Sequence, residues 1–330
     1  AYYMKYGLGK GWMGILFAVL MIITFGFAYN SVQSNTICLA WQKAFGFEPA
    51  TMGIVLTAFT LLIIFGGIQR VAKFSSTVVP LMAIVYLLIA VGVVIWNITS
   101  LPKVLLTIIE NAFGFTQAAG GSLGITVIQG INRGLFSNEA GEGSAPNAAA
   151  VATVSHPVKQ GLIQALGVFT DTLVVCSCTA FIILVSGVDV TASNGIQLTQ
   201  DALTHEIGSI GNPFVAVMIW LFAFSSIIGN YYYGETNVRY IKDSKLGVFI
   251  YRLAVAAMVM VGAVVSLDFA WSFADITMAL LTLCNLVAIV LLSRQAVFLL
   301  QDYRKQKKEG KNPVFKKDMM PEIADQLEAW

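Results

Sequence analysis

The chain has 330 residues, of which 57% are hydrophobic and only 12% are charged. A soluble domain carries roughly a quarter charged residues, so this composition excludes a water-soluble surface. The formal net charge of +2 is mild, and no basic face interleaved with aromatic residues indicates nucleic-acid binding. The composition therefore predicts an all-α polytopic membrane protein.

Apolar segments long enough to cross a bilayer, which takes about 20 helical residues, recur along the whole chain. Their repetition excludes a signal peptide followed by a soluble domain. Eight spans are predicted, at residues 12–30, 51–68, 78–96, 122–152, 162–186, 213–230, 248–265 and 273–292.

Lys and Arg residues fall almost entirely on one side of these eight spans. With the N-terminus inside, the cytoplasmic segments hold all of the 20 basic residues except Lys43, Lys103 and Arg133. Because cytoplasmic loops are enriched in Lys and Arg, both ends of the chain are predicted to be cytoplasmic. We expect a transmembrane core at 1–300, a solvated outer loop at 187–211 and a polar, solvated cytoplasmic tail at 301–330. Contact of the basic residues in the tail with membrane lipid headgroups is the alternative.

The fourth span is unlike the other seven because its middle is polar. Residues 130–147 contain three charged residues, three asparagines and several glycines between apolar flanks. A charge at mid-bilayer costs about 2.5 to 3.5 kcal/mol on insertion scales, so these groups must face protein or a water-filled cavity. The pattern predicts a helix broken around 137–143, a device of transporters. The alternative is two short helices joined by a loop in water.

The polar stretch Gly134-Leu-Phe-Ser-Asn-Glu-Ala-Gly-Glu-Gly-Ser-Ala-Pro146 resembles the signature of the alanine or glycine:cation symporters, also called the sodium:alanine symporter family. Segments 155–161, 169–172, 222–226 and 231–235 are similar to the same family in order and spacing, so the likeness covers the chain up to its tail. The resemblance implies sodium-coupled symport of a small neutral amino acid, alanine or glycine, by alternating access. A bacterial cytoplasmic (inner) membrane is the expected location.

The resemblance also implies a LeuT-like fold of two five-helix inverted repeats, each of which begins with a broken helix. The family's glycine-rich first broken helix is not found ahead of the first predicted span. The eight spans are therefore expected to be core helices three to ten, with the N-terminal part of the family chain missing. The fourth span would be the broken helix of the second repeat.

Residues near the substrate are carried over from the family motif. Phe136, Ser137 and Asn138 are expected beside the amino acid, and the backbone of Gly134, Gly141 and Gly143 is expected to form the broken helix.

Amides on two other spans are further candidates for the substrate pocket. Gln33 either reaches the substrate or serves as a hydrogen-bonding group between helices. Asn230 stands where many relatives carry a tryptophan over the substrate, and Glu142 stands where an apolar residue is more usual. Both departures leave a larger neutral amino acid, such as glutamine, as an alternative substrate.

Three further kinds of residue have competing interpretations. Glu139 is either an anion facing the cavity or a hydrogen-bonded strut for the unwound turn, and Asp171 is either a gate or a buried interhelical partner. Ser225 and Ser226 supply the hydroxyl oxygens that a sodium ion requires, or they bond back to carbonyls one turn earlier.

Other classes of function lack the necessary residues. The two histidines lie in predicted loops and there is no nucleophile–base pair or His-Glu-x-x-His motif, so an enzyme is not expected. The four cysteines lie in apolar segments and indicate neither a disulfide nor a metal site. Sodium is the only ion implied, no cofactor or obligate protein partner is expected, and a passive channel remains the alternative function.

Overall fold

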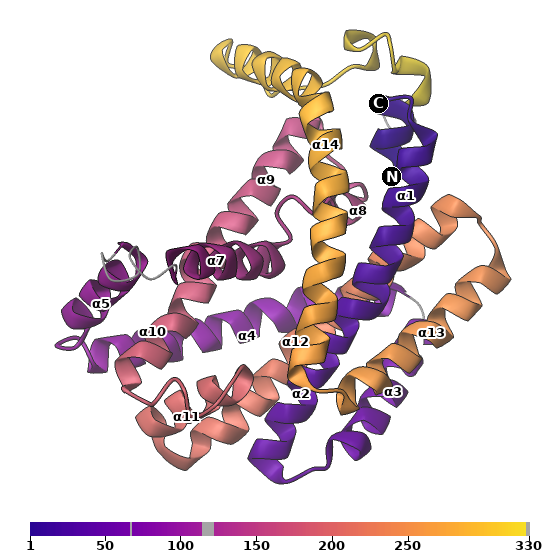
Figure 1. Cartoon of the computed structure of the whole chain (residues 1–330). Helices are drawn as coiled ribbons and strands as arrows, with labels where there is room; N and C mark the ends of the chain where they lie inside the picture. The colour runs from indigo at the N-terminus through magenta and orange to yellow at the C-terminus, as the bar shows by residue number, and fades with distance from the viewer. Residues whose placement is uncertain (67, 114–121, 328–330) are drawn as a thin grey trace.

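The structure is a computed structural model that describes residues 1–66, 68–113 and 122–327. Every regular element in these residues is helical (Figure 1). The elements are η1 (Tyr3–Gly7), α1 (Gly11–Met21), η2 (Ile22–Tyr29), α2 (Asn30–Phe45), α3 (Pro49–Gly66), α4 (Ile68–Trp96), α5 (Leu101–Phe113), α7 (Ser122–Asn138), α8 (Ala145–Ala149), α9 (Pro157–Thr170), η3 (Asp171–Cys176), α10 (Ser177–Ser186), α11 (Ile196–Ile207), η4 (Gly208–Ile210), α12 (Gly211–Ile241), α13 (Lys245–Val264), α14 (Leu267–Lys308), η5 (Lys317–Met319) and η6 (Ala324–Gln326).

Within the described residues, seven helices are long and apolar enough to cross a membrane, which confirms the all-α polytopic class. They are Gly11–Phe45, Pro49–Gly66, Val79–Trp96, Pro157–Ser186, Ile196–Ile241, Lys245–Val264 and Leu267–Lys308. The remaining predicted span, 122–152, is divided between α7 and α8 and is not one continuous helix.

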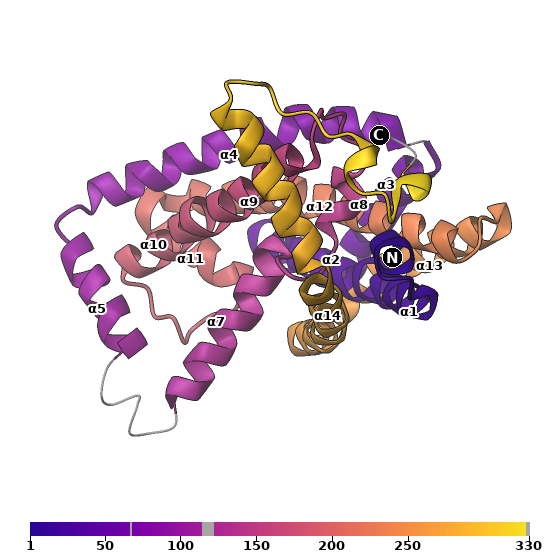
Figure 2. The same ribbon diagram turned by 90° about the horizontal axis from the view of Figure 1, so that it is seen from above.

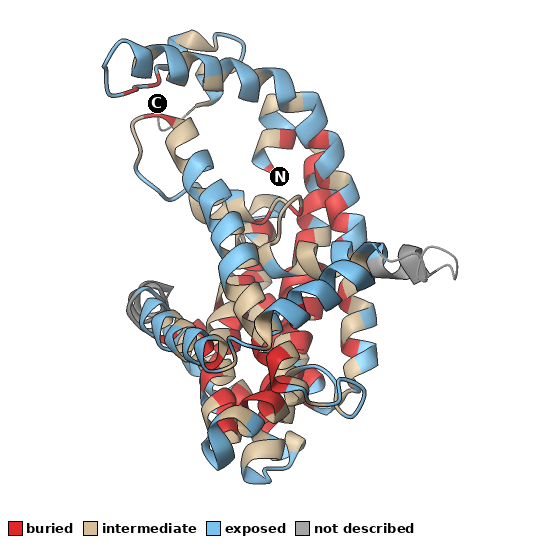
Figure 3. Ribbon diagram, turned by 90° about the vertical axis from the view of Figure 1, so that its left-hand side faces the viewer, coloured by how far each residue is buried: buried red, intermediate tan, exposed pale blue. Residues whose placement is uncertain are grey.

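Helix α12 lies in the middle of the bundle and packs against α2, η2, α1, α11 and α13. Figure 3 shows buried residues gathered in the interior and exposed residues along the outer helices. Many of those exposed residues are large and apolar, such as Leu88, Leu166 and Leu283. An apolar outer surface fits a lipid environment, because no hydrophobic driving force buries apolar side chains that are surrounded by lipid chains.

Helices α2 and α13 approach each other so closely that a side chain cannot fit between them. A β-carbon built at Gly262 would lie 2.5 Å from the Cα and carbonyl oxygen of Ser31. Close by, Asn35 Nδ2 donates to the carbonyls of Gly262 at 3.1 Å and Val265 at 2.8 Å. Small residues and interhelical amides are the usual means of joining helices inside a membrane.

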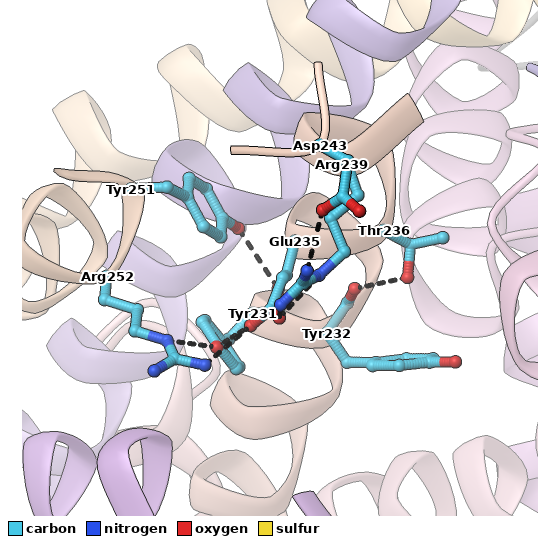
Figure 4. Close-up of polar contacts among 8 residues, drawn as sticks. All are labelled: Tyr231, Tyr232, Glu235, Thr236, Arg239, Asp243, Tyr251 and Arg252. Atoms are coloured by element: carbon cyan, nitrogen blue, oxygen red, sulfur yellow. Dashed lines mark hydrogen bonds and ion pairs between the residues drawn. The ribbon is translucent and has the colours of Figure 1, made fainter. Parts of the chain in front are cut away.

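A charged network joins α12 to α13 near the loop between them (Figure 4). Glu235 accepts hydrogen bonds from Arg239 Nε at 3.0 Å and Nη2 at 2.7 Å, and from the hydroxyl of Tyr231. On α13, Arg252 donates from Nε to the Tyr231 hydroxyl at 2.8 Å and lies 3.4 Å from the Glu235 carboxylate. The Glu235 side chain at the centre of the network is only 7% exposed, whereas its two arginine partners are partly exposed.

The residues after α14 return to the bundle, although the sequence predicts a solvated tail. We call residues 312–315 the C-terminal strap. Phe315 N donates to the carbonyl of Ser155 at 2.8 Å, and the Ser155 hydroxyl donates to the carbonyl of Pro313 at 2.8 Å. Lys159 Nζ donates to Asn312 Oδ1 at 2.6 Å. The strap thereby ties the beginning of α9 to the end of α14, which Figures 1 and 2 show turning near its C-terminus.

The prediction of a solvated outer loop at 187–211 is partly wrong, because these residues include the helix α11. Gln200 on α11 is fully buried and donates from Nε2 to the carbonyl of Ala40 at 3.0 Å. Asp201 pairs with Lys43 of α2 at 2.5 Å. These polar residues, which indicated a solvated loop, dock α11 against α2.

Candidate functional site

The helix break predicted around 137–143 is confirmed. Helix α7 ends at Asn138 and α8 begins at Ala145, with Pro146 at its second residue. Between them, Gly141 and Gly143 have φ of 91° and 82°, and Glu139 is the one non-glycine residue with positive φ in the described chain, at 55°. Residues other than glycine rarely adopt this left-handed backbone conformation. Glycine therefore suits positions 141 and 143, whereas the backbone of Glu139 is strained.

Gly134 lies inside α7, four residues before the helix ends. A β-carbon built at Gly134 would have no atom within 4 Å, so neither a turn nor a close contact requires glycine there. The interruption therefore involves Gly141 and Gly143 but not Gly134.

Side chains from distant helices hold the interrupted segment in place. Asn285 on α14 donates from Nδ2 to the Gly141 carbonyl at 2.7 Å, and its Oδ1 accepts from the Tyr3 hydroxyl at 2.5 Å. A β-carbon at Gly143 would lie 2.8 Å from both Asn285 and Tyr3. These contacts satisfy a backbone carbonyl that the helix has released, as buried backbone requires.

Both glutamates of the turn are hydrogen-bonded. The Ser144 hydroxyl donates to the Glu139 carboxylate, which is the strut arrangement. The Tyr29 hydroxyl donates to Glu142 Oε1 at 2.7 Å, and Glu142 is completely buried. Tyr29 is the last residue of the π-helical segment η2. Turns of π-helix occur frequently at functional sites.

Another π-helical segment, η3, contacts the end of α7. The Ser137 hydroxyl donates to Asp171 Oδ2 at 2.5 Å and lies 3.0 Å from Cys176 Sγ. The neighbouring Asn138 donates from Nδ2 to Thr172 Oγ1 at 2.7 Å. Asp171 is therefore an interhelical hydrogen-bonding partner in this conformation.

A cavity of about 630 Å³ opens between the interrupted segment, α9 and α14. This volume is within the usual range of small-molecule sites. Ser137, Asn138, Glu139 and Asp171 line it together with Tyr3, Gly141, Gly143, Gln164, Asn285 and several apolar residues. Six of the residues predicted for the site, from two separate spans, are thus brought to one cavity.

Phe136 does not line the cavity but packs in a separate group of aromatic side chains. Its ring contacts Tyr29 at a centroid distance of 4.7 Å and Trp271 at 4.6 Å. Arg133, one turn earlier, stacks on Trp271 at 4.2 Å and pairs with Asp275 at 2.5 Å. These contacts join α7 to η2 and α14.

Gln33 and Asn230 do not line the cavity. Gln33 is half-buried on α2, one turn after Tyr29 and on the same helical face. Asn230 is buried on α12, and its Nδ2 has no hydrogen-bond partner among the described residues. Helices α2 and α12 pack against each other, so these amides lie on neighbouring elements.

The paired serines of α12 bond back to their own helix. The hydroxyls of Ser225 and Ser226 donate to the Phe222 carbonyl at 2.7 Å and 3.2 Å. This is the back-bonding arrangement, and it leaves the lone pairs of each hydroxyl oxygen free for other partners.

Sequence reasoning missed Tyr3, Tyr29 and Asn285 as residues of the site. The signal for Asn285 was available, because it is an isolated amide within the apolar run of α14. Nothing in the sequence around Tyr3 indicates its contact with a residue 282 positions away.

Comparison with known proteins identifies the family of the chain. The family model described as the sodium:alanine symporter family matches residues 1–317. The chain belongs to this family. A probable sodium/glutamine symporter of Bacillus subtilis is 54% identical over 97% of the chain and 67% of its own length. An amino-acid carrier protein of the same organism is 51% identical over 100% and 70%, and a sodium/alanine symporter of Methanococcus maripaludis is 35% identical over 93% and 68%.

Membership of the sodium:alanine symporter family settles the general class of activity. The protein is a membrane transporter of the symporter type and not an enzyme. Sodium and an amino acid are the transported partners of this family.

Proposed function

We propose that the protein carries a small neutral amino acid, alanine or glycine, across the membrane together with sodium, by alternating access. The observation that carries the proposal is the interrupted helix at 139–144, whose polar groups line the cavity beside α9 and α14. Interrupted helices hold substrates and coupling ions near the bilayer midplane in secondary transporters. We assign the spans to a LeuT-like inverted-repeat fold, in which the segment at 122–152 is the broken helix of the second repeat.

The substrate pocket in this proposal lies where α7 ends. Ser137 and Asn138 face the cavity there, and Phe136 faces the aromatic contact with Tyr29 on the other side of α7. Gln33 follows Tyr29 by one turn, which supports a role beside Phe136. Glu139 holds the turn, and Asp171 acts as a gate whose bond to Ser137 opens when substrate enters.

Glutamine is a second candidate substrate. The relative that is 54% identical is named as a probable sodium/glutamine symporter. In addition, the Nδ2 group of Asn230 is a buried donor without a partner in the described part of the chain. A side-chain carbonyl of the substrate would satisfy it, and an unpaired buried donor costs about 1–3 kcal/mol.

For sodium, Ser225 and Ser226 are the proposed hydroxyl ligands on α12. Sodium is a hard cation that takes oxygen ligands, and both hydroxyls keep free lone pairs while donating to Phe222. No organic cofactor has a role in this scheme.

We also propose a bacterial cytoplasmic membrane location with both chain ends in the cytoplasm, as the distribution of basic residues supports. Residues 1–300 form the transport core, and 301–330 form a polar segment on the cytoplasmic side, next to lipid headgroups. Cysteine labelling tests the orientation: Ser244→Cys should react with an impermeant reagent only after the cells are opened. Labelling in intact cells would reverse the assignment.

Uptake into proteoliposomes tests substrate and coupling together. Radiolabelled alanine, glycine, serine and glutamine are offered with and without an inward sodium gradient. Sodium-dependent accumulation of alanine or glycine above equilibrium is the expected result, and accumulation of glutamine alone selects the second candidate. Equilibration without accumulation, independent of the gradient, would indicate a passive channel instead.

A further inference from the structure

Glu142 is a buried carboxylate of which only one oxygen has a hydrogen-bond partner among the described residues. It is 0% exposed, and its Oε1 accepts the hydrogen bond from Tyr29. Its Oε2 is also buried and has no hydrogen-bond partner among the residues that the structure describes. A carboxylate removed from water needs a counter-charge and further hydrogen bonds, because its desolvation costs several kcal/mol.

No basic side chain that the structure describes supplies this counter-charge. Arg133 is the one basic residue between 122 and 152, and it pairs with Asp275 of α14. None of the ion pairs in the described chain includes Glu139 or Glu142. Among the described residues, Tyr29 from η2 and Glu139 from the same turn are the titratable groups that interact with Glu142, and neither is a cation.

A second unpartnered oxygen lies beside the same turn. Thr282 of α14 is 6% exposed, and a β-carbon built at Gly141 would lie 3.6 Å from its methyl group. The Thr282 hydroxyl has no hydrogen-bond partner within the described residues. Two buried oxygens without partners, Glu142 Oε2 and the Thr282 hydroxyl, therefore belong to residues at or beside the interruption, and oxygens of both kinds are suitable ligands for a hard cation.

We propose that Glu142 is the binding site of a monovalent cation, sodium or a proton, that supplies the missing positive charge at the interrupted helix. Its residues lie on the interrupted segment and on α14, whereas Ser225 and Ser226 lie on α12. It deepens the proposed function, on which its role in coupling rests, because it places an ion in the element that also carries the substrate residues.

Tyr29 connects this site to the substrate residues. Its hydroxyl bonds to Glu142, and its ring packs edge-on against Phe136 at 4.7 Å and Phe25 at 4.8 Å. When the cation leaves, the Tyr29 hydroxyl is the donor that stabilises the bare carboxylate within the described part of the chain. The position of the Tyr29 ring, and so of Phe136, then depends on whether the cation is bound.

Direct ion measurements on the purified protein, without amino acid, test the site independently of transport. Binding of radioactive sodium is measured at constant ionic strength, with choline as the replacement ion. Infrared difference spectra over a pH series detect a protonated carboxyl group. The variants are Glu142→Gln, which keeps size and removes charge, and Glu110→Gln, a matched control on the exposed surface of α5.

If sodium is the occupant, Glu142→Gln binds one sodium ion fewer per chain than the wild type. If a proton is the occupant, the protonated-carboxyl band disappears in Glu142→Gln. Glu110→Gln should change neither measurement. The proposal is overturned if Glu142→Gln keeps both wild-type sodium binding and the full carboxyl band.

Tyr29→Phe provides a test of opposite sign. It keeps the aromatic contacts and removes the hydrogen bond that stabilises the bare carboxylate, so the cation should bind severalfold more tightly. A structural role for Glu142 alone would not produce loss in one variant and tightening in the other. If binding behaves as expected and uptake fails, the symport proposal is wrong while the cation site stands.

Discussion

Glu235 offers a quantitative test of the network between α12 and α13. In Glu235→Ala, the guanidinium groups of Arg239 and Arg252 lose their shared carboxylate, and the Tyr231 hydroxyl loses its acceptor. Breaking a fully buried pair costs about 3–5 kcal/mol. The side chains of Arg239 and Arg252 are 46% and 25% exposed, so water compensates part of this loss. We expect destabilisation of about 2–3 kcal/mol after this discount.

A neighbouring ion pair is the matched control for this experiment. Asp243 also pairs with Arg239, at 2.9 Å, but its side chain is 76% exposed. Asp243→Ala should therefore cost under about 0.5 kcal/mol. Unfolding of the purified protein in mixed micelles, titrated with sodium dodecyl sulfate and followed by circular dichroism, compares the two variants. Equal midpoints for Glu235→Ala and Asp243→Ala would refute a stabilising role for burial of the network.

Three further predictions concern helix contact, the interrupted segment and sodium. Gly262→Ala places a methyl group against the backbone of α2, so the free energy of unfolding should fall by about 1–3 kcal/mol in the same titration. Asn285→Ala removes the donor to the half-buried Gly141 carbonyl, at a cost of about 1 kcal/mol, and should reduce uptake more than an Ala substitution at an exposed site of α14. Ser225→Ala combined with Ser226→Ala should raise the sodium concentration for half-maximal uptake severalfold, and an unchanged value would remove these serines from the ion site.

The interruption could be predicted from sequence because its causes are local. Gly141 and Gly143 adopt φ values that side chains disfavour, and charged residues at membrane depth exclude an ordinary lipid-facing helix. The spans were predictable for a similar reason, since length and hydropathy alone decide whether a helix can cross a bilayer. In both cases the information lies within about 20 residues of the feature.

The partners of the interruption could not be predicted because they come from distant parts of the chain. Asn285 is 144 positions from Gly141, and Tyr29 is 113 positions from Glu142. Helix α11 is a second case in which a contact with a distant helix decides where a residue lies. Its residue Gln200 reads as a loop residue by polarity, yet it is buried because α2 offers a carbonyl for its amide. Tertiary hydrogen bonds decide these cases, and local composition does not encode them.

The C-terminal strap has a mechanical consequence for the cavity. The cavity lies between α9 and α14, and the strap fastens these two helices together at one end, where His156 is fully buried and lies 3.2 Å from Asp302. If α9 and α14 separate, the joined end limits them to a rotation about the strap, so their displacement grows with distance from the strap. Widening of the cavity is consequently largest away from the strap, toward Ser137 and Asp171, while the fastened end acts as the pivot.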